Sequence, residues 1–144
     1  MSDKGKYNLH PIQLVDLKVL KLCLEIATEK DQNKLPDEGS FSLYSGFSDY
    51  NEDKREIAVK AGIKIDSKED DSPFSLHVEL LCLFHIGDKF PTKYIDSWAD
   101  KNAPLILYPY LREHVHSLTS RAGFEGLILP LFEVPTFKIN IEGK

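Results

Sequence analysis

Histidine is the residue type in this 144-residue chain best suited to metal binding, and five are present: His10, His77, His85, His114 and His116. His114 and His116 are two positions apart in a predicted helix, so they point in different directions and cannot bind one metal in the usual i, i+4 way. His77 and His85 fall in one predicted strand and are about 27 Å apart, at about 3.3 Å per residue. The spacing therefore predicts no metal site.

The two cysteines are the candidates for nucleophilic catalysis, which would pair a thiolate with a histidine and an aspartate. Cys82 lies within the apolar run 80–84, where a charged thiolate is disfavoured. Cys23 lies in a second apolar, strand-like run, and without a secretory signal we interpret both as reduced, buried, small hydrophobic side chains. The glycines form no loop suited to holding phosphate. The sequence therefore predicts no catalytic residue, no cofactor and no enzyme.

The composition indicates one folded domain with an acidic balance. Hydrophobic residues make up 42% of the chain, and 144 residues are enough for a single core. The formal net charge of −5 argues against nucleic acid as a principal partner. The start of the chain shows no signal-peptide region and no run of about 18 apolar residues occurs, so we expect a cytoplasmic protein without membrane insertion. We expect one domain over residues 1–144, with its core at about 10–134 and tails at 1–9 and 135–144.

Two strands are predicted in the first third of the chain. Residues 12–27 are apolar on both parities, and a bulge or a change of buried face near Leu20 would explain the imperfect alternation. A helix is the competing interpretation, because leucine and lysine are good helix formers. After a polar loop, Phe41, Leu43 and Phe47 alternate with polar residues and Tyr44, which predicts a short strand.

Two further strands follow before the helix. Residues 56–66 show the cleanest alternation of apolar and other residues in the chain, which is typical of a half-buried strand. Residues 74–86 begin by alternating and become wholly apolar at 80–84. A strand covered on both faces at one end would have this pattern.

A long helix is predicted after the strands. Pro109 is tolerated in a first turn, so the regular helix is expected to begin near it, and Gly123 stands where a left-handed C-terminal cap is expected. One apolar stripe recurs at steps of three and four: Tyr108, Leu111, Val115, Leu118 and Ala122. The opposite face carries Arg112, Glu113, His116 and Thr119. Strands joined by turns and followed by a helix predict an α+β domain, a four-stranded antiparallel sheet with one long helix packed on one face.

The helix region also carries a family resemblance. Residues 102–113 read NAPLILYPYLRE, residues 117–124 read SLTSRAGF, and Leu129-Pro130 follow. The combination resembles the SecB family of export chaperones, in which Cys/Ala-Pro, Ile-Leu-Phe/Tyr-Pro-Tyr-x-Arg-Glu and Ser-Arg-Gly-x-Phe occur in the same order. The resemblance covers roughly residues 10–134, and outside the helix it consists of a pattern of apolar positions.

The resemblance implies a homotetramer, a dimer of dimers, that holds unfolded or precursor polypeptides in apolar grooves without nucleotide or catalysis. First strands would pair across each dimer and the long helices would meet between dimers. The implied interface residues on the helix are Tyr108, Leu111, Arg112, Val115, His116, Leu118 and Thr119. The implied residues of the client-binding groove are Phe41 and Leu43, followed by Tyr44, Phe47, Tyr94 and Trp98.

The chain departs from the family pattern in two places. At the positions that dock the SecA motor it has Lys21, Glu25, Ser75 and His77, of which only Glu25 keeps the expected acidic charge; this weakens the case for SecA as a partner. The C-terminal helix of the family is expected to be shortened or absent, because Pro135 and the alternation that follows at 137–141 favour an extended end.

Three other functions stay open at this level. The protein could be a SecB-like chaperone of a toxin–antitoxin system, or a non-catalytic oligomeric scaffold of the same fold. A small-ligand binder or enzyme in that fold is the third. A closed polar pocket with convergent titratable groups would favour the third, whereas open apolar grooves would favour a chaperone.

Overall fold

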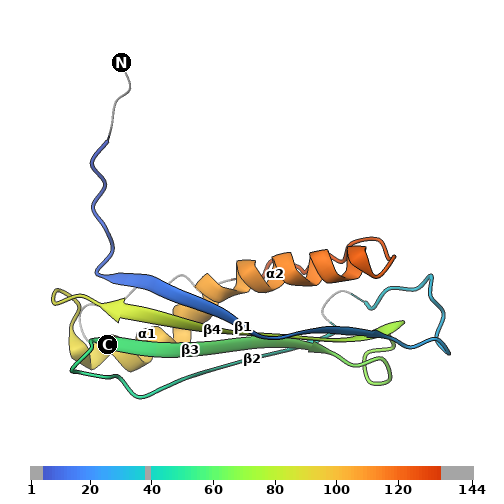
Figure 1. Ribbon diagram of the computed structural model, residues 1–144, viewed down its shortest axis with the longest axis horizontal. Coiled ribbons are helices and arrows are strands. Elements are labelled where there is room, and N and C mark those ends of the chain that lie inside the picture. The colour runs from blue at the N-terminus through green and yellow to red at the C-terminus, as the bar shows by residue number, and fades with distance from the viewer. Residues whose placement is uncertain (1–4, 38–39, 134–144) are drawn as a thin grey trace.

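The computed structural model describes residues 5–37 and 40–133, which form a curved antiparallel sheet with helices on one face (Figure 1). The strands are β1 (Ile12–Ile26), β2 (Ser42–Phe47), β3 (Glu56–Ile65) and β4 (Phe74–Ile86). The helices are a 3-10 turn η1 (Thr92–Tyr94), α1 (Ile95–Lys101) and α2 (Ala103–Arg121). Within these residues the sheet has four strands in the order β1-β4-β3-β2. The α+β prediction is confirmed.

The two central strands supply most of the core. Every second residue of β3 and β4 is buried beneath the helices, as period-2 alternation requires. The largest fully buried side chains on these strands are Ile57, Ile63, Phe74, Leu80, Phe84 and Ile86. On the other face of β4, Leu81 and Leu83 are half-buried, so the predicted coverage of both faces is only partial within one chain. The apolar side chains of Leu81 and Leu83 therefore stay partly exposed on the outer face of the subunit.

The first strand lies at one edge of the sheet, paired on one side only, with β4. Its register shifts between Leu14 and Asp16 and again between Val19 and Lys21, which makes Val15 and Leu20 the bulge residues. The bulge predicted near Leu20 is therefore confirmed. Each bulge switches whether odd- or even-numbered residues face the helices, so apolar residues occur at both odd and even positions of the strand.

The long helix begins earlier than predicted. It starts at Ala103 with Pro104 in its first turn, and Pro109 lies inside it, so the predicted start near Pro109 is wrong. Pro109 cannot donate to the carbonyl of Leu105, and the helix is bent. Burial of Ala103 and Leu107 against the sheet stabilises the turns that the proline would otherwise end.

The buried stripe of α2 also differs from the predicted one. The buried residues recur every four positions: Ala103, Leu107, Leu111, Val115 and Thr119. Tyr108, Leu118 and Ala122 are half-buried beside this stripe, and Thr119, predicted on the opposite face, is fully buried. Gly123 has a φ of +97°, as expected for a left-handed cap.

After the cap, the chain turns back along α2 without a further helix or strand through residue 133. Leu129 in this returning segment is buried, so the segment is part of the packed structure. The predicted extended end, with Pro135 and residues 137–141, lies outside the described residues. No helix in the described ranges is long and apolar enough to cross a membrane.

Candidate functional site

An open groove runs between strand β2 and helix α2. Leu43 and Phe47 pair with Ile63 and Val59, which are buried on the helix-covered face, yet Leu43 and Phe47 are themselves 42% and 41% exposed. They are exposed because β2 is an edge strand and α2 does not reach over it. A hollow of about 180 Å³ in the groove is lined by Leu43, Tyr44, Ser45, Ala61, Gly62, Pro104, Tyr108 and Leu111.

The groove widens toward the start of β2. There a hollow of about 540 Å³ is lined mainly by apolar residues, which are Leu35, Pro36, Phe41, Ile65 and residues 127–131. The polar residues Asp37, Ser40 and Arg112 complete its lining. The two hollows adjoin, since Phe41 and Leu43 are two residues apart and the helix residues Leu111 and Arg112 are neighbours. The site is therefore an elongated, open, mostly apolar trough, unlike a closed small-molecule pocket. The titratable side chains among the described residues that line it are those of Asp37, Arg112, Tyr44 and Tyr108.

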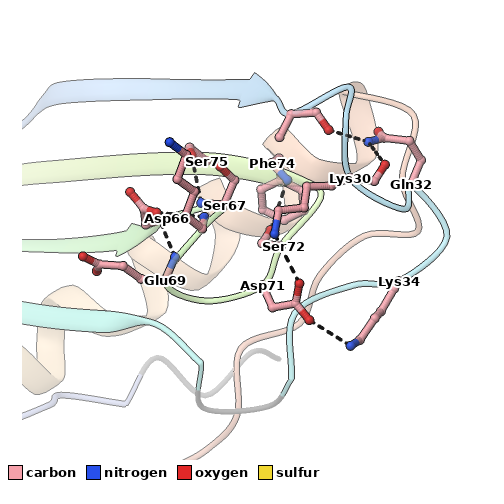
Figure 2. A network of polar contacts seen from close by, with 12 residues as sticks. Lys30, Gln32, Lys34, Asp66, Ser67, Glu69, Asp71, Ser72, Phe74 and Ser75 are labelled. Carbon is pink, nitrogen blue, oxygen red and sulfur yellow. Dashed lines mark hydrogen bonds and ion pairs between the residues drawn. The ribbon is translucent and has the colours of Figure 1, made fainter.

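Ion pairs fasten the loop that forms one wall of the wider hollow. Asp71, in the β3–β4 turn, contacts Lys30 at 3.4 Å and Lys34 at 2.9 Å, and both lysines belong to the β1–β2 loop (Figure 2). Lys34 lowers the pKa of Asp71, and Asp71 in turn raises the pKa of Lys34. This clamp holds the loop next to the turn, and Leu35 and Pro36 follow Lys34 directly into the groove wall.

An aromatic cluster closes the floor of the wider hollow. The ring of Phe132 lies 6.2 Å from that of Phe41 and 5.3 Å from that of Tyr108, measured between centroids. The hydroxyl of Tyr108 donates to the Pro130 carbonyl at 2.6 Å, and Arg112 Nε donates to the Leu129 carbonyl at 3.3 Å. The returning segment therefore lies against the helix residues that face the groove.

The predicted groove residues do not all lie together. Phe41 and Leu43 line the two hollows of the trough. Phe47, four residues further along β2, lines a separate hollow of about 460 Å³ together with Lys60 and Glu79. Trp98 is buried in the subunit core, where it packs edge-on against Phe84 at 5.0 Å, and it lines neither of the two hollows. Tyr94, in η1, stacks under the Lys93 ammonium group at 5.2 Å and lines neither of the two hollows.

Tyr44 points to the opposite face of the sheet, because it is one residue out of phase with Leu43. Its ring crosses Gly62 of β3, and its hydroxyl lies 2.8 Å from Glu79 Oε1 and 2.6 Å from His77 Nε2, both on β4. The hydroxyl donates its single proton to the carboxylate, so His77 is the donor to the tyrosine oxygen. The hydrogen bond from Tyr44 lowers the pKa of Glu79. Tyr44 thus anchors β2 across the sheet. It also lines the smaller hollow, and its role in client binding stays a prediction.

The same outer face carries the positions compared above with a motor-docking surface. Lys21 pairs in register with Glu79, and the exposed Cys23 pairs with His77. Burial, followed by the charges of Lys21 and Lys64, lowers the pKa of His77. Glu25 is exposed near the end of β1. The surface therefore mixes charges of both signs.

The outward surface of α2 contains apolar residues that the sequence pattern did not reveal. Leu105, Ile106 and Tyr110 are each about two-fifths exposed. They were missed because the helix was expected to start near Pro109; starting it at Ala103 would have placed them on one face. Arg112 is half-buried and engaged with the returning segment, and His116 is exposed beside Gly126.

Strand β1 presents a second exposed apolar surface. Val15, Val19, Leu20, Leu22 and Ile26 are 41–52% exposed along a strand whose outer edge is unpaired in the subunit. A long apolar edge strand is a template for pairing with another chain. Among the described residues, no group of three or more metal-ligating side chains gathers, and burial raises the pKa of the Cys82 thiol to about 11.

Sequence comparison decides the family. The family described as preprotein translocase subunit SecB matches residues 19–134. The chain belongs to the SecB family. Its members are non-catalytic chaperones, and the match includes every strand except the start of β1, together with both α-helices and the returning segment.

Three similar proteins extend this picture. An uncharacterized protein of Methanocaldococcus jannaschii is 33% identical over 86 residues, which is 60% of this chain and 54% of that protein. A SecB-like chaperone of Mycobacterium tuberculosis, solved with a peptide from an antitoxin, matches with a TM-score of 0.65 and 17% identity over 85% of this chain and 91% of the other. A protein of unknown function from Streptococcus agalactiae matches with a TM-score of 0.50 and 12% identity over 83% and 97%. At these identities the two structures show the shared fold.

Proposed function

We propose that this SecB family protein is a holdase, a chaperone that binds extended segments of unfolded or precursor polypeptides in the cytoplasm without catalysis. The observation that carries the proposal is the trough between β2 and α2, which leaves Leu43 and Phe47 uncovered beside the half-buried Phe41. Exposed contiguous apolar surface marks binding sites for proteins, and an open trough accepts an extended chain more readily than a compact ligand.

Binding would be passive and tolerant of sequence. Burial of client side chains contributes about 25 cal/mol per Å² of apolar surface, and much of this is offset by ordering the client. A single trough would therefore hold a client weakly. Several troughs on one oligomer would raise the overall affinity, because a bound client reaches the next site at high effective concentration.

We further propose that the oligomer is a tetramer made from two unlike contacts. The unpaired apolar edge of β1 supports a dimer in which two sheets join, and the exposed Leu105, Ile106 and Tyr110 of α2 support contact between dimers. The β1 edge and the α2 patch are both exposed on the single subunit, so each would need a partner subunit to cover it. Light scattering should give a mass near four times 16.4 kDa.

The test of the holdase proposal uses a permanently unfolded protein, reduced and carboxymethylated α-lactalbumin, in titration calorimetry. Leu43→Ser and Phe47→Ser should each weaken binding, because each removes exposed apolar surface from strand β2. Leu9→Ser is the control, since Leu9 is also exposed but lies in the N-terminal segment before β1. No complex at micromolar concentration with the unmodified protein would favour a scaffold of the same fold.

A toxin–antitoxin chaperone is the second candidate. Lys21 and His77 stand where the export chaperones carry their motor-docking residues, which weakens the case for SecA, and the M. tuberculosis protein of similar fold was solved with an antitoxin peptide. Measuring binding to the C-terminal tail of SecA separates the two, since an export factor should bind it and a dedicated antitoxin chaperone should not.

A further inference from the structure

The segment that returns along α2 forms one wall of the wider hollow of the trough. It is fixed at three points: Thr119 Oγ1 accepts from the Leu127 amide at 2.8 Å, Leu129 is buried, and the Leu129 and Pro130 carbonyls accept from Arg112 and Tyr108. Beyond Pro130 the anchoring weakens. Leu131 is 79% exposed and Phe132 is 48% exposed, although the Phe132 ring still packs against Phe41 and Tyr108.

We propose that Pro130–Phe132 is an internal competitor that occupies one end of the groove in place of a client, and that a client displaces it. This inference rests on the proposed holdase function. The segment makes the contacts that an extended client would make, an aromatic side chain against the two groove aromatics and backbone carbonyls against the donors of α2.

The anchoring pattern allows displacement without unfolding the subunit. Leu129 keeps the segment tethered to the core, whereas Leu131 is largely exposed and Pro130 and Phe132 are only partly buried. Pro130 has no amide hydrogen, so its release breaks no hydrogen bond donated by its own backbone. Moving Phe132 away frees a site bounded by Phe41 and Tyr108, together with the Tyr108 hydroxyl.

The contacts also indicate which client segments this end of the groove prefers. Hydrogen bonds to backbone carbonyls are available from any polypeptide, so they add no selectivity. The space between Phe41 and Tyr108 takes an aromatic ring, since aromatic rings 4.5–7 Å apart attract each other beyond simple burial. The competitor therefore sets a threshold: extended segments with an aromatic or large apolar residue displace it, and polar segments do not.

The test compares binding of the carboxymethylated α-lactalbumin to the unmodified protein and to Phe132→Ala. The variant should bind roughly fivefold more tightly, the change expected when a half-buried phenylalanine no longer competes for the site. Tyr7→Ala is the control, because Tyr7 is a highly exposed aromatic residue in the N-terminal segment and its loss should leave affinity unchanged.

A second measurement follows the segment directly. A fluorinated phenylalanine at position 132 should give a fluorine resonance that moves toward the value of a solvent-exposed ring as the client saturates the protein. A resonance unchanged at saturation would overturn the inference, because client and segment would then be bound together.

The affinity data separate the two proposals. If the unmodified protein binds the client and Phe132→Ala binds it equally or more weakly, only the competitor is refuted, and weaker binding would make Phe132 a wall of the client site. If neither protein binds the client, the holdase proposal fails and the inference fails with it.

Discussion

Gly62→Ala is expected to destabilise the subunit by loosening the strand that forms one wall of the groove. A methyl group at Gly62 would lie 2.2 Å from Cζ and 2.3 Å from Oη of Tyr44. These atoms are the far end of a movable side chain, so the ring and not the backbone would give way. The cost is therefore set by the contacts that the displaced ring loses.

The lost contacts are the hydrogen bonds of the Tyr44 hydroxyl to Glu79 and His77. A hydrogen bond to a charged group contributes about 1.5–3 kcal/mol to stability. Alanine in place of glycine within a strand recovers about 0.5–1 kcal/mol by reducing the freedom of the unfolded chain. The net destabilisation should be about 0.5–2.5 kcal/mol, the difference between these two effects.

Urea unfolding at one fixed protein concentration measures this change, in the unmodified chain and in Tyr44→Ala. Without the tyrosine ring nothing occupies the space, so Gly62→Ala should become neutral or stabilising by up to about 1 kcal/mol. The change of sign is the decisive result. If Gly62→Ala changed the free energy of unfolding equally in the unmodified chain and in Tyr44→Ala, the position of the Tyr44 ring would not depend on Gly62.

Other predictions concern assembly, pH and thiol chemistry. Leu22→Lys should convert the oligomer to a smaller species in light scattering, because it places like charges along the β1 edge; an unchanged mass would exclude this edge as an interface. The folded chain holds the pKa of His77 below its ordinary 6.5, so the unfolded chain takes up more protons at acidic pH. Stability from this group is complete well above pH 6.5 and should fall as the pH drops below 6.5, and urea midpoints for His77→Gln should show a smaller fall. Because burial raises the pKa of Cys82 to about 11, Ellman's reagent should modify the exposed Cys23 in the native protein and Cys82 only on unfolding. Rapid modification of both thiols would contradict the buried position of Cys82.

Local pattern was sufficient for the elements of the sheet. The alternation from Ile57 to Ile65 predicts β3 because side chains of a strand point to opposite faces in turn. The disturbed alternation around Leu20 predicted a bulge, and the register of β1 against β4 contains it. Gly123 predicted the end of α2, since a left-handed cap favours glycine. In each of these cases the residues near the feature in sequence were enough to predict it.

The local sequence pattern was insufficient where contacts between residues far apart in sequence decide the extent of a helix or the burial of a side chain. Pro109 is inside α2 because burial of Ala103 and Leu107 on the sheet stabilises turns that local propensity would end. Trp98 is a core residue because Phe84, in another element, packs against it. Thr119 is buried because the chain returns and the Leu127 amide donates to its hydroxyl. Tryptophan and threonine are found at surfaces as well as in cores, so the residue types of Trp98 and Thr119 do not by themselves indicate burial.

The sequence by itself determined the order of the four strands and the long helix, together with the SecB resemblance, because these depend on spacing along the chain. It did not reveal the short helices η1 and α1. Tertiary structure alone decided the shape of the groove. Leu43 and Tyr44 are adjacent in sequence, yet one lies along the trough and the other crosses Gly62 on the far face. The rings of Phe132 and Phe41 pack together although the two residues lie far apart in the sequence. Which face of β2 is covered, and by which segment, depends on how α2 and the returning chain pack, and no local pattern records that.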